Sequence, residues 1–393
     1  MTTAADPEPG GGPLVFLIAG EVSGDALGGR LMAALKRKTG GRVRFAGVGG
    51  ETMAAEGLQS LFPITEISLM GAAEILPHLR RILRRIDQTA DAVRRLKPAA
   101  LVTIDSPAFG LRVAGRVRGL GLPLIHYVAP SVWAYRPGRA RKLARRIDHL
   151  LCLLPFEPPY FDAVGLANTF VGHPAVAEPI PPADGQAFRD RHGIPADAPV
   201  LCVLPGSRRT ETERLLPVFG ATVAILAADH PRLRVVVPTV PGVAADVQKA
   251  VEGWSRPVTV CDGTEKWDAF AACDAALAAS GTVTLELARL KKPMVVAYRM
   301  HPLTSLYIRL KARVKFVSLL NIVLGRAAVP EYLLGACQPE RLAPAVARLL
   351  DDVKDRAAQI EATQDALRLM GAGGLSPSDR AADVVLGLLG PRS

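Results

Sequence analysis

The fold class is decided by the stretch Leu14-Val15-Phe16-Leu17-Ile18-Ala19-Gly20-Glu21-Val22-Ser23-Gly24-Asp25. Its first six residues are all apolar, which is typical of a parallel strand buried on both faces. A loop with two glycines follows, and residues 26–38 then carry apolar side chains at helical spacing. A buried strand that runs into a small-residue loop and a helix is the first half of a βαβ unit. This stretch therefore predicts that the chain begins with an α/β domain.

The alternation of strand and helix continues along the chain and then starts again. Further buried strands are predicted at residues 42–48, 99–104, 124–128 and 149–154. A stretch rich in Pro, Ala and Asp follows at 174–199, and a second series of strands begins at Val200–Leu204. We therefore expect two Rossmann-like, doubly wound domains that face a cleft, with C-terminal helices packing back on the first domain. The predicted segments are a flexible N-terminus (1–12), an N-terminal domain (13–178), a linker (179–198), a C-terminal domain (199–345) and the C-terminal helices (346–393).

Composition narrows the class of protein. The chain has 393 residues, 49% of them apolar, and 48 Lys and Arg against 37 Asp and Glu, a net charge of +11. No apolar run approaches the roughly 18 residues of a membrane span, and the first 12 residues do not have the pattern of a signal peptide. The sequence has no nucleic-acid motif and no metal-ligand spacing. Its five scattered cysteines are expected to be reduced and to pack as small apolar side chains.

Two loops of the first domain carry carboxylates at strand ends, where ligands of open α/β sheets bind. The loop after the first strand holds Glu21, Ser23 and Asp25, and Asp105 directly follows the third predicted strand. Asp105 is placed to accept a proton from a substrate hydroxyl, as a general base does. The alternatives remain open, because Ser23 or Asp25 can be a helix N-cap and Asp105 can cap a turn before Pro107.

A third segment crowds aromatic and polar groups at a strand end. It reads His126-Tyr127-Val128-Ala129-Pro130-Ser131-Val132-Trp133-Ala134-Tyr135-Arg136. Trp133 can stack on a sugar or line an acyl groove, and Arg136 can neutralise a phosphate. The alternatives are packing between domains for Trp133 and a solvated helix face for Arg136.

A fourth pair of loops lies in the second domain. Gly206-Ser207-Arg208 and Ser280-Gly281-Thr282 each place small residues before a predicted helix, where backbone N–H groups and a guanidinium can bind a diphosphate. Glu286 follows Thr282 by four residues, so it shares that helix face and can accept the two hydroxyls of a ribose. N-capping by Ser280 and Thr282 is the open alternative.

A dozen short segments match the pattern of a known family in the same order. In the first half they are Gly20-Glu21-Val22-Ser23-Gly24-Asp25, residues 45–50 with Met53, Met70-Gly71 with Glu74 and Leu76, Ile104-Asp105, His126-Tyr127-Val128, Pro130-Ser131-Val132-Trp133-Ala134, Leu154-Pro155-Phe156-Glu157 and Val171-Gly172-His173. In the second half they are residues 204–208, Ser280-Gly281-Thr282 with Leu285-Glu286, Tyr298-Arg299-Met300, and residues 318–321 with Gly325-Arg326. From about residue 14 to the C-terminal helices, the chain resembles the lipid-A-disaccharide synthases, inverting glycosyltransferases with the two-domain GT-B fold.

The resemblance implies that UDP-2,3-diacylglucosamine donates its sugar to 2,3-diacylglucosamine 1-phosphate. The products would be UDP and the beta-1,6-linked lipid A disaccharide 1-phosphate. Asp105 would deprotonate the acceptor hydroxyl, with Glu21 beside it. The UDP site would be formed, without a metal ion or other cofactor, by Arg208, Ser207, Gly206, Ser280, Gly281, Thr282 and Glu286. The cleft and the acceptor side would hold Ser23, Asp25, Trp133, Arg136, Asn321 and Arg326.

An apolar and basic segment of the first domain predicts contact with a membrane. It contains Met70, Leu76, Arg80, Arg81, Arg84 and Arg85. This combination suits an anionic lipid surface. With the resemblance, it predicts a cytoplasmic protein that is peripheral on the inner membrane of a Gram-negative bacterium, with no nucleic-acid partner. A homodimer is left open.

The sequence also departs from the family's pattern. Family members commonly have Asp and Asn where this chain has Ala108 and Gly110, which affects the expected acceptor contacts, and Leu320 replaces a common proline. Two other functions are kept as alternatives. One is another GT-B enzyme, such as a UDP-sugar 2-epimerase, and the other is a non-catalytic protein that binds a glycolipid or a nucleotide.

Overall fold

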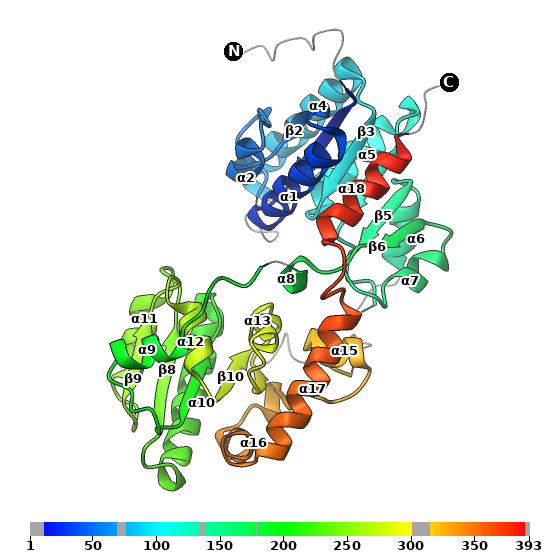
Figure 1. Cartoon of the computed structure of the whole chain (residues 1–393). Coiled ribbons are helices and arrows are strands. Elements are labelled where there is room, and N and C mark those ends of the chain that lie inside the picture. The colour runs from blue at the N-terminus through cyan, green and yellow to red at the C-terminus, as the bar shows by residue number, and fades with distance from the viewer. Residues whose placement is uncertain (1–11, 69–75, 134–137, 178, 301–314, 390–393) are drawn as a thin grey trace. The chain divides into compact units, whose positions relative to one another are not determined.

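The computed structural model describes residues 12–68, 76–133, 138–177, 179–300 and 315–389. Met70 and Arg136, for which the sequence predicts site roles, lie outside these residues. So does the side chain of Leu76. The chain divides into two compact units (Figure 1). Unit 1 consists of Met1–Ala177 and Gly373–Ser393, and unit 2 of Glu178–Ala372.

Unit 1 is built on a six-stranded parallel sheet with the strand order β2-β1-β3-β4-β5-β6. The strands are β1 (Leu14–Ala19), β2 (Arg44–Val48), β3 (Ala100–Ile104), β4 (Leu124–Tyr127), β5 (His149–Cys152) and β6 (Ala167–Phe170). All six residues of β1 are buried, because β2 and β3 pair with its two edges and helices cover both faces. The chain runs from β1 to β2 on one side and then crosses to β3 on the other, so the strand order reverses between β1 and β3.

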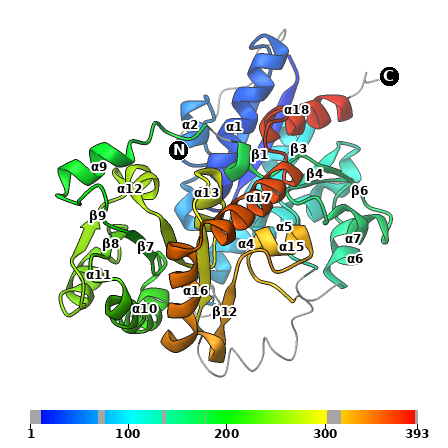
Figure 2. The ribbon, with the colours of Figure 1, turned by 60° about the horizontal axis from the view of Figure 1, so that its bottom comes forward.

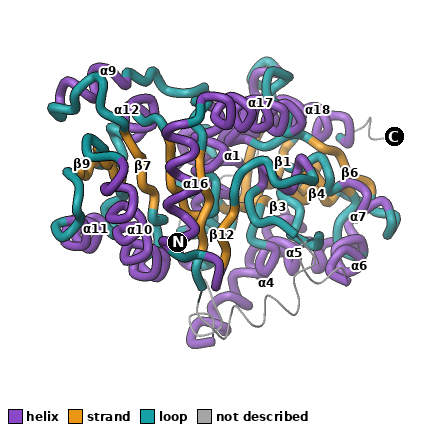
Figure 3. Tube along the Cα trace, turned by 90° about the horizontal axis from the view of Figure 1, so that it is seen from below, coloured by secondary structure: helices purple, strands orange, loops and turns teal. Residues whose placement is uncertain are grey.

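The helices of unit 1 lie on both faces of this sheet (Figure 3). They are α1 (Val22–Thr39), α2 (Glu51–Ala55), α4 (Leu79–Leu96), α5 (Pro107–Val117), α6 (Gly138–Ala144), α7 (Pro158–Asp162), α8 (Pro174–Ala177) and α18 (Pro377–Leu388), with short 3-10 turns at Ile64–Glu66, Leu76–His78 and Arg118–Leu120. Leu31 of α1 and Val385 of α18 pack on the face that carries Val15 and Leu17. The opposite face, which carries Phe16, packs against α4, α5 and α6. The alternation of β1 side chains between two cores is what a period of two requires.

Unit 2 repeats this plan with a second six-stranded parallel sheet, in the order β12-β11-β10-β7-β8-β9. The strands are β7 (Val200–Leu204), β8 (Arg234–Pro238), β9 (Val258–Cys261), β10 (Ala275–Ala279), β11 (Met294–Tyr298) and β12 (Glu331–Leu333). The helices are α9 (Gly185–Arg191), α10 (Arg209–Asp229), α11 (Ala244–Val251), α12 (Lys266–Ala272), α13 (Val283–Arg289), α15 (Leu319–Leu324), α16 (Pro339–Asp351) and α17 (Val353–Leu369), with a 3-10 turn at Leu334–Ala336. Here the strand order reverses between β7 and β10. The predicted α/β class with two doubly wound sheets is confirmed.

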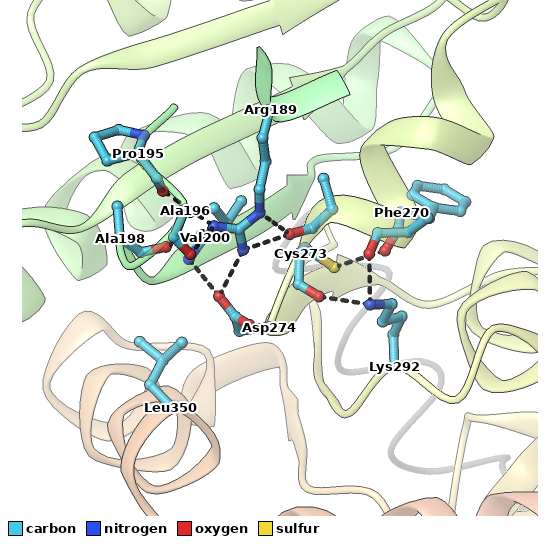
Figure 4. Close-up of polar contacts among 12 residues, drawn as sticks. Arg189, Pro195, Ala196, Ala198, Val200, Phe270, Cys273, Asp274, Lys292 and Leu350 are labelled. Atoms are coloured by element: carbon cyan, nitrogen blue, oxygen red, sulfur yellow. Dashed lines mark hydrogen bonds and ion pairs between the residues drawn. The ribbon is translucent and has the colours of Figure 1, made fainter. Parts of the chain in front are cut away.

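The predicted linker contains a helix that is anchored in unit 2. Figure 4 shows the Arg189 guanidinium of α9 among backbone carbonyls: it donates to Ala272 O at 2.8 and 3.1 Å and to Ala198 O at 2.9 Å. It also contacts the Asp274 carboxylate at 3.2 Å, which in turn accepts the Val200 N–H at 2.8 Å. Arg189 is only 8% exposed, so this part of the segment is a fixed element of unit 2 rather than a free linker.

The C-terminal helices are shared between the two units. α16 and α17 belong to unit 2, where α17 packs on α13 and α15. Only α18 returns to unit 1, where it lies beside α1 (Figures 1 and 2). Arg37 and Lys38 of α1 form ion pairs with Asp379 and Asp383 of α18, each at 2.8 Å. The expected return of these helices to the first domain is therefore made by α18 alone.

Candidate functional site

The first candidate site lies in unit 1, where the strand order reverses between β1 and β3. Ligands of open α/β sheets bind at the carboxyl ends of the strands at such a reversal point. Ser23 in the first turn of α1 donates its hydroxyl to Asp105 Oδ2 at 3.0 Å. The backbone N–H of Ser106 donates to Asp105 Oδ1 at 2.9 Å. Two residues that are 82 positions apart thus meet, and each carboxylate oxygen of Asp105 keeps further lone pairs for a substrate.

The backbone at this strand end is strained. Asp105 and Ser106 both have positive φ angles, of 50° and 35°. A side chain on Gly20 would collide with the side chain of Ser106, so glycine is required where the loop from β1 passes this turn. Non-glycine residues in the left-handed region are concentrated at functional sites, where the surrounding fold enforces them. Asp tolerates this region better than most residues.

Glu21 shares this site with Asp105. Partial burial raises the pKa of Glu21 above its ordinary value, and the nearby charge of Asp105 raises it further. A carboxyl group that retains its proton more readily limits the repulsion between the two acids.

Asp25 does not face this site. Its side chain is 4% exposed, and its carboxylate accepts the backbone N–H groups of Gly50 at 2.6 Å, Thr52 at 2.9 Å and Met53 at 3.2 Å. It therefore satisfies the N-terminus of α2. The predicted contact with the acceptor is replaced by a structural role, because the donors of α2 take up the carboxylate.

Packing against Thr103 of β3 explains why glycine, and not the family's common asparagine, stands at position 110. A Cβ atom on Gly110 would lie 2.9 Å from Thr103 Cβ, so this position has no room for a longer side chain. Thr103 Oγ1 in turn lies 2.7 Å from Nδ1 of the fully buried His126. Burial lowers the pKa of His126 to about 4, so the imidazole is neutral at physiological pH.

Trp133 packs within unit 1. Its ring meets that of Phe156 edge to face, with centroids 5.2 Å apart. The adjacent Glu157 is 3% exposed and accepts the N–H groups of Leu153 and Leu154, both at 3.0 Å. Burial raises the pKa of Glu157 to about 7.

The four arginines predicted to face a membrane are not equivalent. Arg85 donates to both Glu66 oxygens, at 2.6 and 2.9 Å, and lies 4.6 Å from the centroid of the Phe62 ring. Its charge is therefore neutralised within unit 1, whereas Arg80 and Arg84 are exposed and Arg81 is half-buried.

The second candidate site is a pocket of about 260 Å³ at the reversal point of unit 2. It is lined by Leu204, Gly206, Ser207, Glu211, Pro238, Thr239, Val240, Gly263, Lys266, Phe270, Ala279, Ser280, Gly281, Thr282, Val283 and Glu286. The structure thus brings together the two predicted loops after β7 and β10. Gly206 has a φ of +104° and lies against Glu211, so a side chain there would obstruct the loop. Thr239 after β8 adds a buried hydroxyl that has no partner among the described residues.

The loop after β10 leads directly into α13. Thr282 is the N-cap residue, with no cap bond from its side chain, and Ser280 is half-buried while Gly281 is exposed. Glu286 lies in the first turn of α13, where its carboxylate contacts Lys266 Nζ at 3.0 and 3.1 Å. Lys266 was not predicted as a site residue, because it is 20 positions away from Glu286 and belongs to no motif.

Arg208 does not line this pocket, although Ser207 before it and its partner Glu211 do. Arg208 is 70% exposed and contacts Glu211 at 3.3 Å. Glu211 also accepts the hydroxyl of Tyr298 at 3.2 Å. The Glu211 side chain is only 14% exposed, but the guanidinium is largely in solvent, where an ion pair contributes little. Arg208 can therefore exchange Glu211 for an anionic ligand.

Asn321 and Arg326 lie elsewhere in unit 2. Asn321 is fully buried, and its amide binds Val329 O and Glu331 while accepting the N–H groups of Ala328 and Val329. Every polar atom of this side chain is used to hold the segment before β12, which leaves none for a substrate. Arg326 is exposed and lines a separate cavity of about 320 Å³ beside α16 and α17.

Within the described ranges, no three His, Cys, Asp or Glu side chains are grouped as a metal site requires. Of the helices described, none is long and apolar enough to cross a membrane.

Solved structures identify the class of this fold. A UDP complex of MnaA from S. aureus matches with a TM-score of 0.63 and 13% identity, over 96% of this chain and 97% of that chain. MurG of Acinetobacter baumannii matches with a TM-score of 0.57 and 14% identity, over 96% and 100%. With two parallel sheets that each place a candidate site at a reversal point, the protein has the GT-B fold of glycosyltransferases.

Sequence comparison identifies the family. The family model of lipid-A-disaccharide synthetase matches residues 15–381. The lipid-A-disaccharide synthase of Rhodospirillum centenum is 56% identical over 382 residues, which cover 96% of this chain and 95% of the relative. That of Paramagnetospirillum magneticum is 53% identical over 377 residues, which cover 95% and 97%. The chain belongs to the lipid-A-disaccharide synthase family, as the motif pattern predicted, and is a glycosyltransferase.

Proposed function

We propose that the protein transfers the sugar of UDP-2,3-diacylglucosamine to the 6-hydroxyl of 2,3-diacylglucosamine 1-phosphate. The oxygen of this hydroxyl attacks the anomeric carbon as the bond to the diphosphate breaks, and UDP leaves with the bonding electrons. The configuration is inverted and the product is the beta-1,6-linked disaccharide 1-phosphate. Membership of the family over residues 15–381 is the observation that carries this proposal.

Unit 1 supplies the base. Asp105 accepts the proton of the acceptor hydroxyl, while Ser23 and the Ser106 N–H fix the orientation of its carboxylate. Positioned proton acceptors of this kind contribute about 10²- to 10⁴-fold to a rate. Glu21 lies near enough for its pKa to be affected by Asp105, and we assign it to the same step.

Unit 2 holds the donor in the 260 Å³ pocket. The N–H groups of the Ser280-Gly281-Thr282 loop and of Gly206-Ser207 face the diphosphate, and the Arg208 guanidinium moves from Glu211 to a phosphate oxygen. Glu286 accepts the ribose hydroxyls. These groups stabilise the charge of the leaving diphosphate, so we expect UDP release to be unchanged by EDTA.

The proposed substrates are acylated and are therefore expected at a membrane surface. We propose that it is peripheral on the cytoplasmic face of the inner membrane, with the exposed Arg80 and Arg84 of α4 directed to anionic lipid headgroups. Sedimentation in the presence of both substrates tests whether the protein forms a homodimer.

The experiment that tests the function measures UDP release with and without the acceptor. Release only in the presence of both acylated sugars supports the transferase. An epimerised sugar formed without acceptor would identify an epimerase, and binding of UDP-sugar without any turnover would identify a binding protein. Either of these outcomes refutes the proposal.

A further inference from the structure

Lys266 forms a polar contact with Glu286 in the donor pocket. Its Nζ atom lies 3.0 Å from one carboxylate oxygen and 3.1 Å from the other, so it bridges the pair. The side chains of Lys266 and Glu286 are 31% and 23% exposed, and both line the same cavity as the Ser280 loop. This pair is therefore part of the pocket wall rather than a surface ion pair.

The ammonium group is held on one side of the carboxylate. Lys266 is the first residue of α12, and its Nζ lies 4.9 Å from the centroid of the Trp267 ring and 5.9 Å from that of Phe270. Both rings attract a cation through their faces. Because Phe270 itself lines the pocket, these contacts restrain Lys266 where it meets Glu286.

A bridged carboxylate has a fixed direction for its remaining lone pairs. A carboxylate offers about four acceptor positions, and one ammonium group in contact with both oxygens occupies one position on each. The remaining position on each oxygen points outward, on opposite sides of the carboxylate, so a ribose hydroxyl can be accepted at a defined oxygen. The positive charge also offsets the repulsion between Glu286 and a diphosphate bound in the same cavity.

We propose that Lys266 is a positioning residue that orients Glu286 to accept the 2′-hydroxyl of a ribose and so makes the pocket selective for ribonucleotides. This inference rests on the proposed function, in which Glu286 receives the ribose of UDP. It assigns a specificity role to a residue outside every motif of the sequence. A site whose polar groups are arranged for a hydroxyl discriminates against a ligand that lacks it.

The test measures the Kd values of UDP and 2′-deoxy-UDP by calorimetry on the full-length protein. The variants are Lys266→Met, Glu286→Gln and the double variant, with Lys266→Arg as a conservative change. Lys249→Met serves as the matched control, because Lys249 is exposed on α11 outside the pocket. Thermal unfolding of each variant shows whether it is folded.

We expect Lys266→Met to lower the preference for UDP over 2′-deoxy-UDP about tenfold, a difference typical of one charge-assisted hydrogen bond. In the Glu286→Gln background the same change has little further effect on this preference, because Lys266 acts through Glu286. Lys266→Arg retains part of the preference, and Lys249→Met retains all of it.

Two outcomes overturn the inference. Equal weakening of both nucleotides, also in the Glu286→Gln background, would show that Lys266 binds the phosphates directly. An unchanged preference in a folded Lys266→Met variant would show that it has no role in selecting the sugar. Failure of the wild-type protein to bind UDP at all is a different result, because it refutes the proposed function itself.

Discussion

Replacement of Asp105 by Asn removes the proposed base with little change to the structure around it. Asn tolerates the left-handed backbone at this position, where φ is 50°, whereas Ala would add strain. The amide oxygen can accept the Ser106 N–H in place of Oδ1, and the amide nitrogen can donate to Ser23 Oγ in place of the bond at 3.0 Å. The free energy of unfolding should therefore change by at most about 1 kcal/mol.

The effect on catalysis is expected to be much larger. A neutral amide cannot accept the proton of the acceptor hydroxyl, so the loss should match the contribution of a general base, about 10²- to 10⁴-fold in kcat. This corresponds to about 3–5 kcal/mol in the activation free energy. Binding of UDP should be unchanged, because the donor pocket is formed by unit 2 alone.

The assay is UDP release under saturating concentrations of both substrates, together with UDP binding and thermal unfolding of the same preparation. Asp91→Asn is the matched control, since Asp91 is 70% exposed on α4 and pairs only with Arg94 among the described residues. A kcat for Asp105→Asn within threefold of the wild type would refute the role of Asp105. A comparable loss in Asp91→Asn would show that the defect is not specific to the site.

Three further predictions concern stability and the membrane. Burial raises the pKa of Glu157 to about 7 from 4.5. Between these pH values the folded state binds a proton that the unfolded chain releases. The free energy of unfolding should therefore fall by up to about 3 kcal/mol as the pH rises. Glu157→Gln should flatten this dependence in denaturant titrations at pH 5 and 8, and an unchanged slope would contradict it. Arg189→Met should lower the free energy of unfolding by about 3–5 kcal/mol because it leaves buried partners unpaired. The control Arg191→Met removes a side chain that is 47% exposed and should lower it by about 1 kcal/mol or less. Equal losses of stability in the two variants would refute the role of burial. Neutralising Arg80 and Arg84 should weaken binding to anionic vesicles about 30-fold at low salt, from about 1 kcal/mol per charge, and binding that stays unchanged would exclude this surface.

The sheets were predictable because their strands are buried on both faces. A strand with neighbours on both edges and helices above and below must be apolar at every position, as Leu14–Ala19 and Val200–Leu204 are. The sequence also located Asp105 and Ser23 at strand ends. It did not show that they touch, because this requires β3 to pair with β1, which local patterns do not specify.

The errors at the site have a common physical cause. Asp25 was expected to face the acceptor and Arg85 a membrane. The structure instead shows Asp25 bound to the N-terminus of α2 and Arg85 bound to Glu66. Lys266 was missed because its role comes from a tertiary contact: its partner Glu286 lies on another helix. Sequence patterns give the chemistry of a side chain, whereas its availability is decided by tertiary contacts.

The short helix α9 was missed because it lies in a stretch rich in proline, alanine and aspartate, which is typical of a linker. Its seven residues are too few for a helical period to be visible. Tertiary contacts hold it instead, chiefly those of the buried Arg189.

The central claim is transfer of a sugar from UDP to the hydroxyl of a phosphorylated glycolipid. The most direct measurement quantifies UDP and disaccharide 1-phosphate in the same reaction and determines the anomeric configuration of the new linkage by NMR. We expect one UDP for each beta-1,6-linked disaccharide and no UDP when the acceptor is omitted. UDP formed without acceptor, or a product with the alpha configuration, would contradict it.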